Sequence, residues 1–475
     1  MLYRDVWDQK PPGIHLTYAA GFAIFGASDG TVLVLDAIAA TLACALVFQI
    51  ARRLGSARAA WMSVIAFAIG TYPAFALPYG GFLERAVPET FITALAAAAA
   101  WCAVTSRFAL MGLAIGTAAV FKPTALIYWP VFAVCGVRGA ECGVRRTQSI
   151  AAALGVSGAA LLVPIGAVLI WLSANGALAD ARVAVIDYNR AYVVAGSSWL
   201  ALPNILAHEI WRLVKTDPLW FAAAAAAGVA VWSFARKTED GRRKTEVLPA
   251  IAVAWLAAAV IAAAANGVRM YATYFLPTAP PLALLVGSLA TERRSRRLLN
   301  AAIVVGAGLV AIRSHYPDRL VRYLAADLAQ LRGSAPRAPY LEMFGGYANG
   351  RGYSARANDE LASYLRARTR DDDRVYIFGM APSVYFDARR LPANRFIWTF
   401  PAVAPFAGGP AFTVDALAAD LQRAAPTYLV LERNNRDSST GWRIDDVYSA
   451  PAIQRVFEAY AREIEIEDFT VLRRR

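Results

Sequence analysis

The sequence predicts a polytopic α-helical membrane protein that carries a small soluble α/β domain at its C-terminus. Hydrophobic residues make up 58% of the 475 residues and charged residues only 17%, which is below the roughly 25% usual for soluble domains. Long alanine-rich apolar runs recur up to residue 314 and then stop. Basic residues gather in short loops beside those runs, as they do in membrane proteins.

About ten apolar runs are candidates for membrane-spanning helices, which need about 20 apolar residues each. An earlier apolar segment, 14–27, is too short for a full span, and an interfacial or re-entrant helix fits it better. The ten candidate spans are 31–51, 59–77, 88–106, 108–121, 123–137, 148–173, 217–235, 247–266, 271–291 and 298–314.

The positions of the basic residues predict the orientation of these spans. The short loops that hold most of the arginines and lysines are expected in the cytoplasm. Residues 1–30, the loop 174–216 and everything after 314 are then expected outside, in the periplasm of a bacterial inner-membrane protein. This topology accounts for the net charge of +13 without a nucleic-acid partner. The chain thus begins outside without a signal peptide, so we expect a further helix before Met1, giving eleven or more spans in the full-length protein.

The domain boundary is expected at residue 314, between a transmembrane domain (1–314) and a soluble α/β domain (315–475). No nucleotide-binding glycine fingerprint or phosphate loop is found in the second domain. Its pattern predicts strands at 374–379 and 427–432, a third strand at 463–472, and helices at 358–368 and 414–423 with Asn358 and Thr413 as N-caps.

The segment Tyr3–Gly13 concentrates charged side chains at the predicted membrane rim. Asp5, Asp8 and Lys10 stand directly before a proline pair, which holds the preceding residues extended. Charges at the rim of a membrane are costly unless they are solvated, paired or used. We interpret the segment as half of a site for an anionic, membrane-borne substrate. The alternative is a solvated loop that only marks the interface.

Three further charged residues are expected on the same outer side. Pro88 suits the first position of a helix, which places Glu89 in a first turn, where the helix dipole favours an acid. Lys122 and Arg269 could each hold a lipid phosphate, with Tyr274 near Arg269. The structural alternatives are a helix-start glutamate and basic side chains that reach the interface from apolar segments.

Polar and aromatic residues in the long outer loop form another candidate. Tyr188 and Asn189 lie in a stretch that could stack against a sugar ring, or could belong to an interfacial aromatic belt. The four cysteines show no metal-ligand spacing and the three histidines are far apart, so metal ligation has weak support.

Four stretches together resemble bacterial membrane glycosyltransferases of the GT-C superfamily, the relatives of the protein O-mannosyltransferases and of the lipid A aminoarabinose transferase. The residues from Asp5 to Gly13 resemble the first periplasmic loop of these enzymes, and Pro88-Glu89-Thr90-Phe91 resembles their second acidic motif. Tyr274-Phe275-Leu276-Pro277 resembles a late span. Arg374–Gly379, with residues up to Phe396, resembles their small C-terminal domain.

The resemblance implies transfer of a sugar from a polyprenyl-phosphate donor to a glycan, lipid or protein acceptor outside the cytoplasm. It implies that Lys10 and Lys122 hold the phosphate and that Glu89 assists the acceptor or the sugar. Asp5 and Asp8 would be the remaining first-loop carboxylates, and a divalent cation could take part. In these families the principal catalytic aspartate precedes the Lys-Pro-Pro motif, whereas this chain begins after that point.

Two other classes of function remain open on the sequence: a transporter or flippase of a lipid-linked glycan, and an inactive protein that binds a lipid carrier. Transporters usually show internal repeats and charges near the bilayer midplane. Here the candidate charges are expected at the outer rim and no repeat is found, which favours the transferase.

Overall fold

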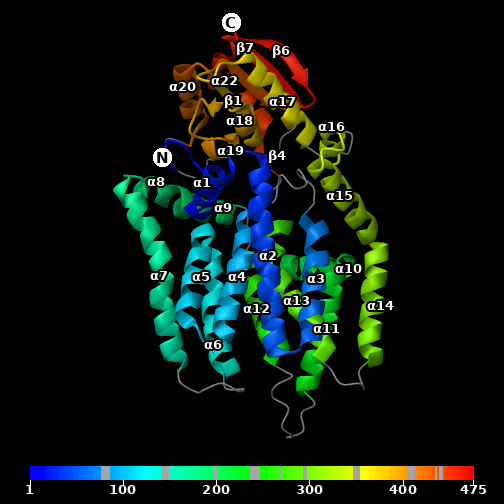
Figure 1. Cartoon of the computed structure of the whole chain (residues 1–475). Coiled ribbons are helices and arrows are strands. Elements are labelled where there is room, and N and C mark those ends of the chain that lie inside the picture. Colours follow the sequence, from blue (N-terminus) through cyan, green and yellow to red (C-terminus); the bar gives the residue numbers. More distant parts are fainter. Residues whose placement is uncertain are drawn as a thin grey trace.

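The computed structural model describes residues 1–75, 86–140, 149–195, 200–235, 247–267, 270–291, 297–345, 354–403, 412–433, 436–437 and 442–475. A bundle of helices forms one half of the molecule, and a domain with a β-sheet lies at one end of the bundle (Figure 1). The N-terminus lies at that same end, beside the domain (Figure 1). The N-terminal segment and the C-terminal domain are therefore neighbours although they are far apart in sequence.

Each of the ten apolar runs lies on helical structure. Prolines begin several of these helices at positions where no backbone N–H is needed, as in α1, α4 and α11. The helices and helical turns up to residue 313 are α1 (Pro12–Phe25), α2 (Asp29–Leu54), α3 (Ala57–Phe75), α4 (Pro88–Val104), α5 (Phe108–Phe121), η2 (Pro123–Ile127), α6 (Tyr128–Ala140), α7 (Ile150–Ala174), α8 (Leu178–Arg182), η3 (Val183–Tyr188), α9 (Asn189–Ala195), α10 (Leu202–Thr216), α11 (Pro218–Ala235), α12 (Val247–Ala264), η5 (Ala272–Thr278), α13 (Ala279–Ser288), η6 (Leu289–Thr291) and α14 (Arg297–Arg313).

Length and hydropathy together identify fewer complete spans than the ten expected. Within the described residues, α2, α7 and α12 are long and apolar enough to cross a membrane. Helices α14 and α15 (Tyr316–Leu331), bent by 65° at their junction, pass the same test as a pair. Over the part of the chain that the structure describes, the other apolar helices do not pass this test, so the number of spans stays a prediction.

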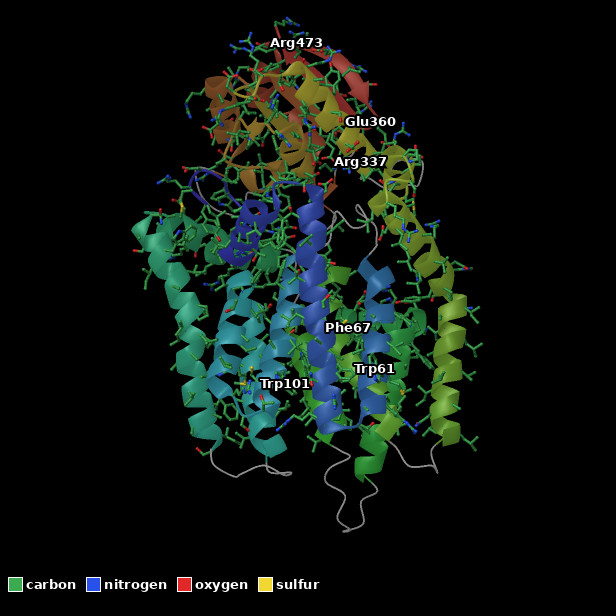
Figure 2. The ribbon with its side chains drawn as sticks, in the orientation of Figure 1. Trp61, Phe67, Trp101, Arg337, Glu360 and Arg473 are labelled. Atoms are coloured by element: carbon green, nitrogen blue, oxygen red, sulfur yellow. The ribbon has the colours of Figure 1, made fainter. Side chains whose placement is uncertain are left out.

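Apolar side chains cover the outside of the bundle, as a lipid-facing surface requires. Trp61 is 60% exposed and Ile170 is 72% exposed, on α3 and α7. Figure 2 shows Trp61, Phe67 and Trp101 along the bundle, whereas Glu360 and Arg473 belong to the opposite domain. Inside the bundle, α5 and α7 approach closely at Gly112, where an added Cβ would lie 2.0 Å from the carbonyl oxygen of Ser157. Such small residues allow tight helix contacts in membranes.

The C-terminal domain is a five-stranded sheet with helices on both faces. The strand order is β2-β1-β3-β7-β6; β1 pairs in parallel with β2 and β3, and β7 pairs antiparallel with β3 and β6. Its elements are α16 (Arg337–Leu341), α17 (Ala355–Arg368), β1 (Arg374–Phe378), α18 (Ser383–Ala388), β2 (Leu391–Pro392), α19 (Thr399–Ala402), α20 (Val414–Ala424), β3 (Tyr428–Glu432), β4 (Arg436–Asp437), β5 (Trp442–Arg443), α21 (Ile444–Tyr448), α22 (Pro451–Phe457), β6 (Tyr460–Ile466) and β7 (Phe469–Arg474).

Alternation along β1 separates the two faces of this sheet. Val375 and Ile377 pack with α17 and α18, whereas Tyr376 and Phe378 pack with α20 and α22. Arg337 ties the domain to the bundle, because its guanidinium contacts Asp29 of α2 at 2.9 Å and Asp359 of α17 at 2.8 Å (Figure 2).

Two expectations for this domain are corrected. The single strand expected at 463–472 is a hairpin of β6 and β7, whose turn includes Glu467 in the left-handed region at φ 50°. Helix α17 begins earlier than expected and is capped by Ser354, which accepts from the Ala357 N–H, while Asn358 is buried inside it. The strands at 374–378 and 428–432 and the Thr413 cap of α20 are confirmed.

Candidate functional site

Glu89 and Lys122 form an ion pair inside the bundle, at the end that faces the C-terminal domain. Lys122 Nζ donates to Glu89 Oε1 at 2.7 Å and lies 3.8 Å from the centroid of the Tyr274 ring. The side chain of Glu89 is only 8% exposed and that of Lys122 19%. A carboxylate, an ammonium group and an aromatic face are thus held together with little access to water.

Local sequence explains how these side chains meet. Pro88 begins α4, as expected, so Glu89 lies in its first turn. Helix α5 ends at Phe121, and Pro123 keeps Lys122 extended at φ −160°, so that its side chain leaves the helix. The rings of Phe91 and Phe121 stack at 5.2 Å and hold the two helix ends together.

A second charged group forms around Asp8, which is buried in the N-terminal segment. Its Oδ2 lies 3.7 Å from Lys10 Nζ and 3.3 Å from His15 Nε2, and its Oδ1 accepts from the Lys10 backbone N–H at 3.3 Å. Burial alone would raise the pKa of Asp8, but the neighbouring Lys10 and His15 outweigh it and lower the pKa to about 2. Asp8 is therefore an ionised carboxylate that holds Lys10 in place.

Asp5 has a different environment from Asp8. Its exposed carboxylate pairs with the Arg4 guanidinium at 2.8 Å and with the amino group of Met1 at 2.5 Å. The hydrogen bond from Arg4 is the main reason that the pKa of Asp5 lies well below its usual range. Neither Asp8 nor Glu89 is among the partners of Asp5. Asp5 and Asp8, which the sequence suggested as parts of one site, therefore belong to different ion pairs.

The N-terminal segment is clamped between the bundle and the C-terminal domain. Trp7 is 1% exposed, its backbone N–H donates to the Arg395 carbonyl at 2.8 Å, and its ring packs against Phe396 with the ring centroids 5.2 Å apart. Tyr188 is buried in the same aromatic cluster, 4.8 Å from the Trp7 ring. Asn189 Nδ2 donates to the Gln9 carbonyl at 2.7 Å. Both candidates from the long loop thus hold the first segment, and their contact with a sugar stays a prediction.

Contacts through α1 bring the two charged groups to the same end of the bundle. Gly13 lies so close to α5 that an added Cβ would be 2.8 Å from the Val120 carbonyl oxygen, two residues before Lys122. The Tyr18 hydroxyl donates to the Ala86 carbonyl at 3.4 Å, three residues before Glu89. Lys10 and Glu89 therefore lie at the same end of the bundle, and the side of the membrane that they face stays a prediction. Arg269 falls outside the described residues.

Sequence reasoning missed two residues that complete this region. Asp36, on α2, accepts from the Ala86 N–H at 3.0 Å and from the Thr90 hydroxyl at 3.4 Å, and so orders the start of α4. A lone acid within an apolar run is a functional signal in membrane helices, and it could have identified Asp36. Trp398 comes from the C-terminal domain, with its ring centroid 5.9 Å from Lys10 Nζ. The sequence carries no signal for that contact.

The described residues contain no group of three His, Cys, Asp or Glu side chains that could hold a metal ion. Asp8 and His15 are adjacent, but Lys10 occupies the same carboxylate. The candidate site instead consists of two lysines, each paired with a carboxylate. Such ammonium groups can exchange their carboxylate partner for the oxygen of an anionic ligand.

Comparison with solved structures shows which proteins have a similar fold. ArnT from Cupriavidus metallidurans bound to undecaprenyl phosphate matches with a TM-score of 0.58 and 16% identity, over 98% of this chain and 87% of that one. The apo state of the same protein matches with a TM-score of 0.55 and 17% identity, over 98% and 88%. An apo oligosaccharyltransferase from Archaeoglobus fulgidus matches with a TM-score of 0.49 and 14% identity, over 90% and 62%.

Sequence comparison adds nothing to these matches: no family model matches the chain, and no curated protein matches it. The two matches to ArnT span nearly the whole of this chain. The chain therefore shares the fold of ArnT.

Proposed function

We propose that this protein is a glycosyltransferase that moves a hexosyl or pentosyl group from a polyprenyl-phosphate donor to an acceptor. The observation that carries the proposal is the buried Glu89–Lys122 pair, set on this fold at the same end as Lys10. The site would face the periplasm from a bacterial inner membrane, and the acceptor would be a glycan, a lipid or a protein. Support comes also from the ArnT structure, which holds undecaprenyl phosphate.

Each charged residue has a role in this proposal. The acceptor nucleophile attacks the anomeric carbon, the bond from that carbon to the phosphate oxygen breaks, and the lipid phosphate leaves with the bonding electrons. Lys10 and Lys122 stabilise the negative charge on the phosphate. Glu89 takes the proton of the acceptor as a general base. Asp8 keeps Lys10 oriented, and Asp5 would act only if it left Arg4.

The ion pair between Glu89 and Lys122 suggests that the donor binds before the acceptor. In the free protein Lys122 neutralises Glu89, so the carboxylate is occupied. A donor phosphate competes with Glu89 for Lys122, because an ammonium group also binds phosphate as a point charge. Donor binding would thereby release Glu89 for the acceptor. Tyr274 lies against Lys122 and limits the positions that its ammonium group can reach.

Sugar transfer from synthetic polyprenyl-phosphate sugars tests the proposal in nanodiscs that contain the purified protein, with and without added divalent cation. Glu89→Gln and Lys122→Met should lower the rate by about 100-fold or more, as expected for loss of a general base or of a charge-stabilising group. Lys215→Ala is the matched control, because Lys215 is an exposed lysine on α10.

Unchanged transfer in both site variants would overturn the assignment of these residues. Movement of the labelled lipid across the bilayer without any transfer would favour a flippase instead. Donor binding without transfer or movement would leave a protein that only binds the carrier.

A further inference from the structure

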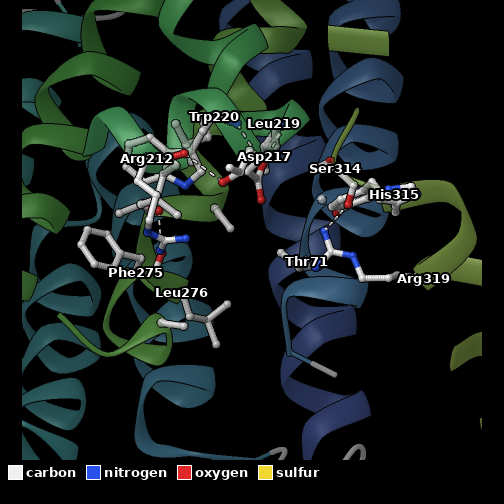
Figure 3. A pocket seen from close by; sticks show the side chains of 18 residues that line it. Thr71, Arg212, Asp217, Leu219, Trp220, Phe275, Leu276, Ser314, His315 and Arg319 are labelled. Atoms are coloured by element: carbon white, nitrogen blue, oxygen red, sulfur yellow. Dashed lines mark hydrogen bonds between the residues drawn. The ribbon is translucent and has the colours of Figure 1, made fainter. Parts of the chain in front are cut away.

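A cavity of about 540 Å³ is lined in part by η5, the segment that also carries Tyr274 of the candidate site; Figure 3 shows its lining residues. The segment η5 places Tyr274 against Lys122, and its next two residues, Phe275 and Leu276, line the cavity. None of Lys10, Glu89 and Lys122 lines it. The cavity is thus a separate space next to the proposed transfer site, and its volume is within the range of small-molecule sites.

The wall of this cavity has an apolar part and a polar part. Helices α11 and α13 and the segment η5 contribute the apolar part, with Leu219, Trp220, Phe275, Leu276 and Leu282. The polar part comes from α10, from the helix junctions at residues 217 and 314–315, and from α15; it contains Arg212, Asp217, Ser314, His315 and Arg319. Apolar and charged walls in one cavity suit an amphiphile, a molecule with a polar head and an apolar chain.

Arg319 brings a positive charge to the wall of this cavity. Its Nη2 donates to the Ser314 carbonyl at 3.1 Å, but its buried Nε has no hydrogen-bond acceptor within the described residues. The side chain is half-buried, and its guanidinium carbon lies 5.8 Å from the centroid of the Tyr316 ring, which leaves the Nη groups as the donors for a ligand. Phosphate and carboxylate oxygens are the groups that a guanidinium binds best.

Two other charged residues of the cavity, Arg212 and Asp217, limit the kinds of polar group that could bind there. Arg212 is already engaged by Glu209, one turn before it on α10. Asp217 uses Oδ1 to accept from the backbone N–H groups of Leu219 and Trp220 at 2.9 and 3.1 Å, and its Oδ2 makes no hydrogen bond within the described residues. The cavity therefore offers Arg319 for an anion and Asp217 for a hydrogen-bond donor.

We propose that this cavity binds the headgroup of a phosphate-bearing lipid that also carries an ammonium or hydroxyl donor. The phosphate contacts Arg319, the donor contacts Asp217, and the start of the acyl chain follows the apolar wall at Leu219 and Phe275. A bulk phospholipid and a phosphorylated glycolipid acceptor share this chemistry. The binding does not require that the chain transfers sugar.

Native mass spectrometry of the protein in a non-ionic detergent tests the proposal. The probes are phosphatidylethanolamine, which has phosphate and ammonium; phosphatidylcholine, which has phosphate without a donor; and diacylglycerol, which has neither. Arg319→Ala should weaken phosphatidylethanolamine binding about tenfold or more, the effect of losing one charge-assisted hydrogen bond. Asp217→Asn retains the cap on α11 and should abolish the preference over phosphatidylcholine.

Arg322→Ala is the matched control, since Arg322 lies one turn later on α15, is exposed and does not line the cavity. It should bind as the wild type does. The proposal is overturned if Arg319→Ala binds phosphatidylethanolamine normally, or if Arg322→Ala loses as much. Arg319→Lys, which keeps the charge, should recover part of the binding and shows whether the alanine variant is merely misfolded.

Water-soluble phosphoethanolamine and a phosphorylated glycolipid distinguish the two sources. Competition by the glycolipid at lower concentration than by phosphatidylethanolamine assigns the cavity to an acceptor, and the reverse order assigns it to a bulk phospholipid. Competition by diacylglycerol equal to that of both would refute recognition of the phosphate.

Discussion

The buried ion pair between Glu89 and Lys122 makes a quantitative prediction for stability. Removing one partner of a buried pair leaves the other charge unpaired and costs about 3–5 kcal/mol. The Lys122 side chain is 19% exposed, so water reaches the position of its ammonium group. When Lys122 is replaced, this water can partly solvate the carboxylate of Glu89. We therefore expect Lys122→Met to cost about 3 kcal/mol, the lower end of that range.

The two variants differ in what they leave behind. Glu89→Gln leaves an amide oxygen that can still accept from Lys122, and a hydrogen bond to a charged group is worth about 1.5–3 kcal/mol, so the cost of this variant should be smaller, about 2 kcal/mol. The double variant buries no charge at this position and should cost no more than either single variant. The expected coupling energy is then about 3 kcal/mol, at the upper end of the range found for contacting residues.

The assay is equilibrium unfolding in mixed micelles, followed by tryptophan fluorescence, for the wild type and the three variants. Lys215→Ala serves again as the control for loss of a lysine. If the cost of the double variant equals the sum of the single costs to within about 0.5 kcal/mol, the two side chains do not interact and the argument from burial fails.

Three further predictions follow from carboxylates outside this pair. Because the pKa of Asp8 is lowered from 3.8 to about 2, its stabilising effect is complete above pH 3.8 and is lost as the pH falls towards 2; Asp8→Asn should remove that pH dependence from a fluorescence titration. Asp36→Ala leaves the Ala86 N–H without its acceptor and should cost about 1–3 kcal/mol and lower sugar transfer, whereas Asp36→Asn should retain most of both; thermal melts and transfer rates measure this. Burial raises the pKa of Asp468 from 3.8 to about 6, so the fold loses stability as the pH rises from 3.8 to about 6, and the loss is complete above 6; Asp468→Asn should raise Tm at pH 8 by a few degrees and have a smaller effect at pH 5.

The helical bundle was predictable because apolar runs and proline positions are local properties. Glu89 was expected in a first turn from Pro88, and the structure confirms this position. Its partner was not expected, because the contact with Lys122 joins the start of one helix to the end of the next. The sequence identified Glu89 and Lys122 separately as candidates on the same side. A pattern of single residues cannot predict which of them pair.

The C-terminal hairpin shows why other features were missed. The alternation of the segment 463–472 is imperfect because β6 has a register shift between Arg462 and Ile464, and because the chain turns at Glu467. Contacts such as Trp7 with Phe396, or Lys10 with Trp398, depend on the docking of two distant parts of the chain. No local periodicity carries that information.

The hydrogen bond from Trp7 to the carbonyl of Arg395 has a consequence for biogenesis. A ribosome releases the first of these residues long before it makes the second, so the N-terminal segment must wait, unpartnered, until the last domain has been synthesised and folded. Lys10, one of the two lysines that we assign to the donor phosphate, would thus reach its final position only when the last domain has folded. An unfinished chain could not act on a lipid carrier prematurely.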